Sequence, residues 1–260
     1  MTSRADQVVV VAGVGPGLGR AVALASAREG AAVVLAARTA TRLEEVRAEI
    51  VASGGRAIAV PTDVADGSQC TALAQAALDA YGSIDVLVHT SFARPAPGLL
   101  RDRTARDWHE SLDGNVLAAT QLVHAVAPTM RAQGAGAVVL VSSVSARQPF
   151  PQSGIYATMK AALLTLTKVF AQELGADGIR VNCVVPGYID GPGLERFFET
   201  LAAERGTTAA AARASVASVT CLGRIPSADE VAAAVMFFAS AGASGITGQS
   251  LDVNGGQWFG

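Results

Sequence analysis

The stretch VVVVAGVGPGLGR, residues 8–20, decides the fold of this chain. Its four consecutive valines are typical of a strand buried on both faces, and glycines follow at positions 13, 15, 17 and 19. A strand that runs through glycines into a helix directs free backbone N–H groups and the positive helix end toward one point. The stretch therefore predicts a pyrophosphate-binding turn, with a tight turn that holds no ligand as the alternative.

The alternation of strand and helix continues along the chain. Apolar, β-branched runs occur at residues 8–11, 33–37, 57–60, 84–88, 137–141, 179–185 and 250–253, and the gaps between them have helical periodicity. This pattern predicts an α/β fold: a Rossmann-like, doubly wound parallel sheet of about seven strands with helices on both faces, in a single domain spanning 1–260. The alanine-rich stretch 207–217 is expected to be a helix with Arg213 in solvent.

Composition narrows the class of protein. The 260 residues are 50% hydrophobic, and 20 basic against 22 acidic side chains form no cationic block, which argues against a nucleic-acid partner. The first residues lack an export signal and no later apolar run reaches membrane-spanning length, so we expect a cytoplasmic protein without a membrane partner. Cys70, Cys183 and Cys221 have neither disulfide nor metal-ligand spacing; we expect buried, inert thiols and no metal site.

The end of the second predicted strand indicates which dinucleotide binds. It carries Arg38, whereas a carboxylate there would bind the ribose 2′-OH and repel a 2′-phosphate. A guanidinium offers forked donors to a phosphate, so NADP(H) is favoured, with NAD(H) possible. The alternative is that Arg38 is a surface residue paired with a nearby glutamate. Arg42 could assist, but its spacing predicts an ion pair with Glu45 and Glu49.

The candidate catalytic residues are Ser143, Tyr156 and Lys160. Tyr156 and Lys160 are four residues apart on a helical segment, so their side chains share one side. An adjacent ammonium lowers the pKa of a phenol, which brings tyrosine toward use as an acid or base. Ser143 ends a predicted strand and can hold the substrate oxygen. A tyrosine–lysine spacing alone also fits an exposed helix surface, but the preceding strand, serine and glycine turn favour chemistry here.

With these motifs in this order, the chain resembles the short-chain dehydrogenase/reductase family over nearly its whole length. Residues 12–19 are similar to the family's glycine motif, and Asn115, Ser143, Tyr156 and Lys160 match its catalytic set. The resemblance implies that Tyr156 is the acid/base, Ser143 orients the carbonyl or alcohol, Lys160 holds the nicotinamide ribose, and Asn115 positions a water linked to Lys160. The residues predicted to bind the cofactor are Gly13, Gly17, Leu18, Gly19, Arg38, Asp63, Val64, Tyr156, Lys160, Pro186, Gly187 and Ile189.

The resemblance implies hydride transfer between a nicotinamide and a small-molecule ketone or secondary alcohol, in a homo-oligomer, tetramer or dimer. Residues 188–217 are expected to cover the active site, where Phe197 and Phe198 suggest a hydrophobic substrate. Core or subunit contact explains the two phenylalanines equally well. Phe92, Arg94 and Phe150 are further candidates for the pocket lining.

One segment departs from the family pattern. His89, Thr90, Ser91 and Phe92 stand where the family usually has Asn-Asn-Ala-Gly, at a strand end expected to lie on the adenosine side. His89 is interpreted as a structural histidine rather than a base, because the tyrosine mechanism already has its base. Two other functions stay open: a nucleotide-binding scaffold or regulator that lost catalysis, and an epimerase or enoyl reductase that uses the same site.

Overall fold

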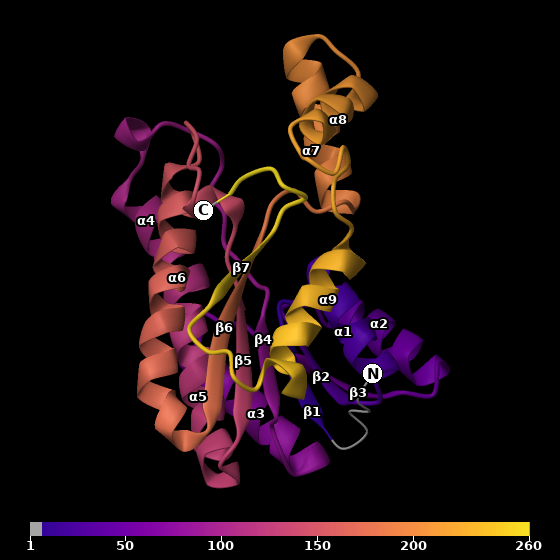
Figure 1. Ribbon diagram of the computed structural model, residues 1–260, viewed down its shortest axis with the longest axis vertical. Helices are drawn as coiled ribbons and strands as arrows, with labels where there is room; N and C mark the ends of the chain where they lie inside the picture. Colours follow the sequence, from indigo (N-terminus) through magenta and orange to yellow (C-terminus); the bar gives the residue numbers. More distant parts are fainter. Residues whose placement is uncertain (1–6, 260) are drawn as a thin grey trace.

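Seven parallel strands form the centre of the molecule. We describe residues 7–259 of a computed structural model, apart from the side chain of Arg205. The strand order is β3-β2-β1-β4-β5-β6-β7, which confirms the predicted doubly wound sheet (Figure 1). The strands are β1 (Val8–Ala12), β2 (Ala32–Ala37), β3 (Arg56–Pro61), β4 (Val86–His89), β5 (Gly136–Val141), β6 (Ile179–Pro186) and β7 (Ser250–Val253).

Helices cover both faces of this sheet. One layer contains α1 (Leu18–Arg28), α2 (Ala40–Ala52) and α9 (Ala228–Ala239), and the other contains α3 (Gly67–Tyr81), α5 (Ala118–Gln133) and α6 (Gly154–Leu174). Figure 1 shows α5 and α6 on the opposite side of the sheet from α1, α2 and α9. Among the described residues, no helix is both long and apolar enough to span a membrane.

The two faces have separate cores because successive strand residues point to opposite sides. In β1, Val8 and Val10 belong to the core beneath α3, α5 and α6, whereas Val9 and Val11 belong to the core beneath α1, α2 and α9. All four valines are buried. Each fully buried side chain of this kind contributes about 1.5–3 kcal/mol. The unbroken valine run is therefore the direct consequence of a strand with two apolar faces.

Successive strands are added to the sheet first on one side of β1 and then on the other, and the change of side falls between the neighbours β1 and β4. Strands β2 and β3 extend from β1 on one side, and β5, β6 and β7 extend from β4 on the other. In open parallel sheets, ligands bind at the carboxyl ends of the strands at such a reversal. The glycine turn after β1 and the segment after β4 meet at this point.

A π-helical turn interrupts a long helix near this edge. Helix α4 (Ala105–Leu112) runs into the π-turn η2 (Asp113–Leu117) and then into α5. At Gly114 a Cβ atom would lie 2.5 Å from the Cβ of Ala93, so only glycine allows the segment after β4 to approach here. Periodicity alone did not predict the π-turn, a feature that occurs often at functional sites.

Helices α7 (Pro192–Arg205) and α8 (Ala209–Ser218) project beyond the sheet (Figure 1). Phe198 is fully buried in a small core of their own, so it adds nothing to an apolar patch; Phe197 is 41% exposed. The Arg213 side chain is 38% exposed, and its guanidinium pairs with Asp190 at 2.5 Å and with Glu195. These ion pairs tie α8 to the start of α7.

The cysteines follow the prediction in part. Cys70 and Cys183 are buried, and burial raises the pKa of each thiol to about 11, as expected for inert thiols. Cys221 is exposed, which corrects the expectation that all three are buried. It lies in the turn after α8, where its side chain packs against Gly256.

Candidate active site

The glycine turn after β1 combines two crowded glycines with one open position. A Cβ at Gly13 would lie 2.2 Å from the backbone nitrogen of Ser91, and one at Gly19 would lie 2.2 Å from the Gly13 carbonyl oxygen. Gly13 also has a φ of +104°. A Cβ at Gly17 would meet no atom within 4 Å. Packing inside the protein therefore requires Gly13 and Gly19, whereas Gly17 borders space that a ligand can use.

The start of α1 is open to an anion. Its N-cap is Gly17, which has no side chain to bind the first N–H groups, and the first turn carries no acidic residue. Such a helix end offers unpaired N–H donors and a positive dipole to a phosphate. Leu18 is the first residue of this helix and is partly buried in the core beneath it. The residues present here fit a bound diphosphate.

The segment after β4 holds this turn in place. The Thr90 hydroxyl lies 3.2 Å from the Ala12 carbonyl oxygen and 3.0 Å from that of Gly13. The backbone N–H groups of Thr90 and Ser91 also donate to the Ala12 carbonyl. The unusual sequence at residues 89–92 thus supports the glycine turn through a hydroxyl. No sequence motif indicated this role of Thr90.

Two arginines stand at the end of β2. Arg38 is exposed directly after this strand, and Arg42 follows in the first turn of α2. Neither has an ion pair with a described residue. The predicted pairing of Arg42 with Glu49 is wrong, because Glu49 reaches across to Arg20 on α1 at 2.6 Å. Both cations near the adenosine end of the predicted cofactor site are therefore available to a phosphate.

The other predicted cofactor residues lie at ends of neighbouring strands. Asp63 follows β3, and one of its carboxylate oxygens accepts from the Ala65 N–H at 3.1 Å. Val64 packs against the core. Pro186 is the last residue of β6, and the Gly187 N–H donates to the Val253 carbonyl at 3.3 Å. Ile189 also packs against the core. Because all strands are parallel, these residues share one edge of the sheet.

The structure brings Ser143, Tyr156 and Lys160 together. Ser143 follows β5, whereas Tyr156 and Lys160 belong to the first turns of α6. Ser143 lies near enough to the Tyr156 phenol to lower its pKa, and the Lys160 Nζ atom lies 5.8 Å from the centroid of the tyrosine ring. Ser142 fixes the helix by donating from its hydroxyl to the Lys160 carbonyl at 2.7 Å.

The pKa of Tyr156 beside Lys160 differs from the prediction. Lys160 is 2% exposed, and its ammonium donates to the Val141 carbonyl at 3.0 Å rather than to the phenol. Burial lowers the pKa of Lys160 to about 8. Burial also raises the pKa of Tyr156, against the opposing effects of the Ser143 hydroxyl and the Arg94 charge. The expectation that Lys160 makes the phenol acidic is wrong for this arrangement; the cation that acts on Tyr156 is Arg94.

Asn115 lies in the π-turn and is fully buried. Its side-chain NH₂ donates to the carbonyl oxygens of Ala93 at 2.7 Å and Ser111 at 2.8 Å. The side-chain oxygen is buried and has no partner among the described residues. Asn115 thus attaches the segment after β4 to the helix, and its role in holding a water stays a prediction.

His89 and Phe92 explain what the unusual segment does. His89 is fully buried, with Nδ1 3.2 Å from the Ser91 hydroxyl, and burial together with the Lys160 charge lowers its pKa to about 3. This confirms a structural histidine. The Phe92 ring centroid lies 6.1 Å from that of Tyr156 and 5.7 Å from the Lys160 Nζ atom. The segment therefore runs from the glycine turn to the catalytic candidates, and the expected place of its strand end on the adenosine side stays a prediction.

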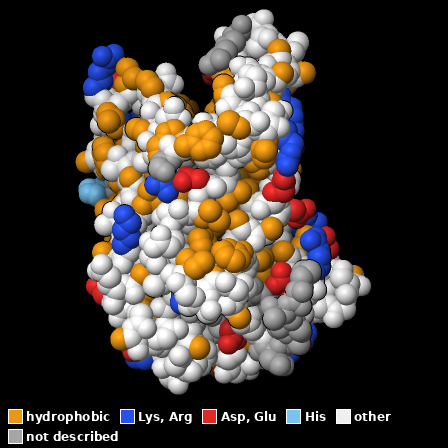
Figure 2. All heavy atoms as spheres, viewed as in Figure 1, with side chains coloured by type: hydrophobic (Ala, Val, Ile, Leu, Met, Phe, Trp, Pro, Cys, Tyr) orange, Lys and Arg blue, Asp and Glu red, His pale blue; other side chains and the backbone are white. Residues whose placement is uncertain are grey.

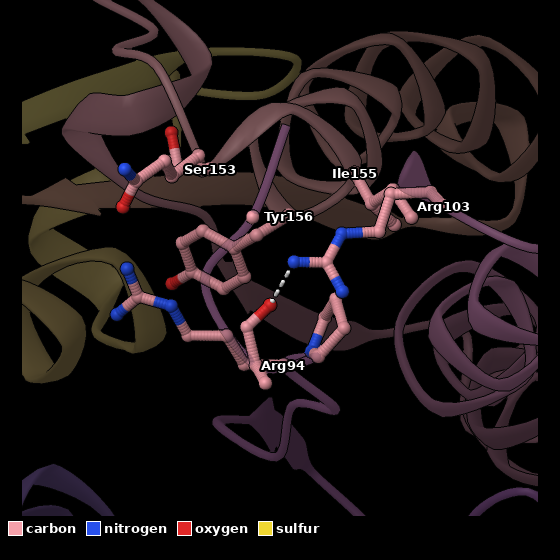
Figure 3. A pocket seen from close by; sticks show the side chains of 9 residues that line it. Arg94, Arg103, Ser153, Ile155 and Tyr156 are labelled. Carbon is pink, nitrogen blue, oxygen red and sulfur yellow. Dashed lines mark hydrogen bonds between the residues drawn. The ribbon is translucent and has the colours of Figure 1, made fainter. Parts of the chain in front are cut away.

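A hollow lies beside Tyr156 (Figure 3). Arg94 places its guanidinium carbon 4.8 Å from the centroid of the Tyr156 ring. Arg103 also lines the hollow, and it donates to the Ala96 carbonyl at 2.7 Å. Of the three predicted lining residues, Arg94 lines this hollow, whereas Phe92 and Phe150 do not. Arg103 was not predicted, because its loop has no regular periodicity.

Comparisons with known proteins agree with this geometry. A family model described as enoyl-(acyl carrier protein) reductase matches residues 13–257. Short-chain reductase protein NovJ of Streptomyces niveus is 35% identical over 257 residues, which cover 97% of this chain and 94% of that protein. The chain belongs to the short-chain dehydrogenase/reductase family and is an NAD(P)-dependent oxidoreductase acting on C=O or CH–OH groups.

Solved structures show the same fold. L-sorbose reductase from Gluconobacter frateurii, complexed with NADPH and L-sorbose, has a TM-score of 0.93 at 31% identity, covering 98% of each chain. A variant of actinorhodin polyketide ketoreductase with NADPH has a TM-score of 0.91 at 27% identity, covering 99% of each chain. Both were therefore solved with the same cofactor.

Proposed function

We propose that this protein catalyses NADP(H)-dependent reduction of a ketone, or oxidation of the corresponding secondary alcohol, with Asn115, Ser143, Tyr156 and Lys160 as the working group. The observation that best supports the proposal is the contact between Ser143 and Tyr156 at the same sheet edge as the open glycine turn. A hydroxyl pair beside a diphosphate site suits a carbonyl group held against a nicotinamide.

In the proposed mechanism, Tyr156 moves the proton and Ser143 holds the reacting oxygen. When bound, the nicotinamide supplies or accepts the hydride. Because burial raises the pKa of Tyr156, its phenol is protonated near neutral pH and can donate to a carbonyl oxygen. Lys160 would bind the nicotinamide ribose through its ammonium. The protonated phenol is the form that reduction requires, and the phenolate left after proton transfer is the base for the reverse reaction.

The cofactor preference in the proposal is NADP(H). Arg38 and Arg42 have no carboxylate partner within residues 7–259, and no carboxylate follows β2 to repel a 2′-phosphate. Forked guanidinium donors recognise such a group well. The NADPH complexes of the two structural neighbours support the same preference.

The proposed substrate has an apolar body. Phe92, Phe150 and Phe197 remain exposed. Figure 2 shows a notch between the α7–α8 projection and the part of the molecule that carries α4, with hydrophobic side chains near its base. Such a notch offers apolar contact to a ketone whose carbonyl reaches Tyr156.

We also expect the protein to form a homo-oligomer. Light scattering of the purified protein would measure its mass in solution.

Reduction of a C=C bond is the second candidate, because the matching family model is described as enoyl-(acyl carrier protein) reductase. Both reactions use a hydride and a proton donor, and they differ in the carbon that receives the hydride. A deuterated cofactor separates them. Deuterium on the carbinol carbon shows ketone reduction, whereas deuterium on a saturated chain carbon shows enoyl reduction.

The test begins with fluorescence titration of the protein with NADPH and NADH, followed by a panel of ketones and enoyl compounds with deuterated NADPH. We expect tighter binding of NADPH and deuterium on the carbinol carbon. Cofactor binding without turnover of any panel member would instead favour a nucleotide-binding scaffold or regulator. Absence of cofactor binding would refute the enzymatic proposal.

A further inference from the structure

The hollow beside Tyr156 is positively charged in a protein whose formal net charge is −2. Its lining includes two guanidinium groups, from Arg94 and Arg103, and no acidic side chain. Figure 3 shows the Arg94 side chain next to Tyr156, with Arg103 on the other side of the hollow. The charge is therefore local to this place and does not follow from the composition of the chain.

Arg94 differs in its partners from eight other arginines of the described part. The Arg94 side chain is exposed, and it has no ion pair with any described carboxylate. Arginines that do pair with carboxylates in the described part are Arg20, Arg47, Arg101, Arg106, Arg131, Arg147, Arg213 and Arg224. The contact that Arg94 makes is with the face of the Tyr156 ring. That contact leaves the N–H groups of its guanidinium open to an acceptor.

The loop around Arg94 is held on both sides. Asn115 donates to the carbonyl of Ala93, the preceding residue, and Arg103 donates to the carbonyl of Ala96. These bonds of 2.7 Å fix the backbone on which Arg94 stands. A cation on a fixed backbone loses less conformational entropy when it binds a ligand than one on a mobile loop.

We propose that Arg94 binds a carboxylate on the substrate, one or two bonds from the carbonyl that Tyr156 protonates. The substrates would then be 2-oxo or 3-oxo acids with an apolar tail. A planar guanidinium matches a carboxylate with two parallel N–H donors, and its position against the reactive ring keeps the two functional groups of the ligand close. This inference rests on the ketone reduction proposed above.

A competing role for Arg94 acts on the phenol alone. Its positive charge opposes the effect of burial on Tyr156, so its loss could slow every substrate. That role predicts equal losses for charged and neutral ketones. A carboxylate-binding role predicts a loss that depends on the charge of the substrate, and this difference forms the test.

The experiment compares kcat/KM for 2-oxo-4-phenylbutanoate, its ethyl ester and the neutral ketone 4-phenyl-2-butanone. The variants are Arg94→Gln, Arg94→Lys and, as a matched control, Arg101→Gln, whose side chain is 80% exposed. We expect the wild-type protein to prefer the acid over the ester by at least about tenfold. Arg94→Gln should abolish that preference, Arg94→Lys should keep part of it, and Arg101→Gln should leave it intact.

NADPH titration of each variant provides the second readout, since an unfolded or damaged variant would lose cofactor binding. Equal losses for acid, ester and ketone in Arg94→Gln would overturn the carboxylate assignment. So would reduction of the ester and ketone by the wild-type protein with no preference for the acid, which leaves the proposed ketone reduction standing. If the wild-type protein reduces none of the three, and no ketone of the wider panel, the proposed function itself fails and this inference fails with it.

Discussion

Lys160 is the residue at which function and stability conflict. Lys160 is 2% exposed, and the one described hydrogen bond of its ammonium goes to the Val141 carbonyl. Burying a cation with so little compensation destabilises the charged form, as the lowered pKa shows. A structural role would not require this amine. Its position beside Tyr156 is consistent with the ribose-binding role that we propose.

This conflict predicts a pH dependence of stability. The pKa of Lys160 is lowered from 10.5 to about 8, so the unfolded chain binds more protons than the folded chain between these two values. The free energy of unfolding therefore rises with pH across this window, by about 3 kcal/mol in total, and the contribution is constant below pH 8. The difference in free energy of unfolding between the wild-type protein and Lys160→Met should therefore change by this amount, in favour of the wild type, from pH 8 to pH 10.5.

Urea unfolding at pH 8 and pH 10 would measure this change. Lys168→Met is the matched control, because Lys168 lies on the same helix with its side chain exposed. The free energy of unfolding of the Lys168→Met variant should change between the two pH values as that of the wild-type protein does. Parallel profiles for wild type and Lys160→Met would show that the buried amine does not titrate as described.

The glycines of the turn between β1 and α1 have different roles. Gly13 and Gly19 let the turn, the segment after β4 and helix α1 approach one another. Gly17 has open space beside it and stands at the free start of α1. The same motif thus contains packing positions and a ligand-binding position, which a sequence pattern cannot tell apart.

Alanine substitutions separate these positions. Gly17→Ala should keep the stability of the protein and weaken NADPH binding by at least about tenfold, because the methyl group enters the space of the diphosphate. Gly19→Ala should lower the free energy of unfolding, since its Cβ would lie 2.2 Å from a backbone oxygen. Thermal unfolding and fluorescence titration test both. Normal NADPH binding by a folded Gly17→Ala protein would move the diphosphate away from this turn.

The end of β2 determines the choice between the two dinucleotides. Arg38→Asp removes a donor for the 2′-phosphate and adds a carboxylate that repels it and can bind a ribose 2′-OH. The ratio of the NADH and NADPH dissociation constants should shift toward NADH by more than about tenfold. Arg56→Gln, on the neighbouring strand β3, is a control for general charge. An unchanged ratio in Arg38→Asp would remove this residue from cofactor recognition.

At the scale of the whole molecule, the sheet gathers residues from distant segments at one edge. The strands and the doubly wound sheet could be predicted because runs such as residues 8–11 and 137–141 are apolar on both faces, as expected for a parallel sheet covered by helices on each side. The glycine turn and the pairing of Tyr156 with Lys160 are also local patterns. Each of these depends on residues within a few positions of one another.

What the sequence could not predict depends on packing between remote segments. The pKa of Tyr156 is raised because several elements bury it, and the cation on its ring is Arg94, from a loop 62 positions earlier in the chain. Glu49 pairs with Arg20 rather than Arg42 because α1 and α2 lie side by side. Phe92 turned to the catalytic side for the same reason: the π-turn at Asn115 holds its loop there.

In the function that we propose, Tyr156 transfers the proton to the ketone oxygen. Tyr156→Phe retains the ring that packs against Phe92 and Arg94 and removes only the hydroxyl. The most direct test measures single-turnover reduction of a ketone by this variant together with its NADPH dissociation constant. We predict a rate lower by roughly 10²- to 10⁴-fold with NADPH binding nearly unchanged. A rate close to that of the wild-type protein would show that Tyr156 is not the proton donor.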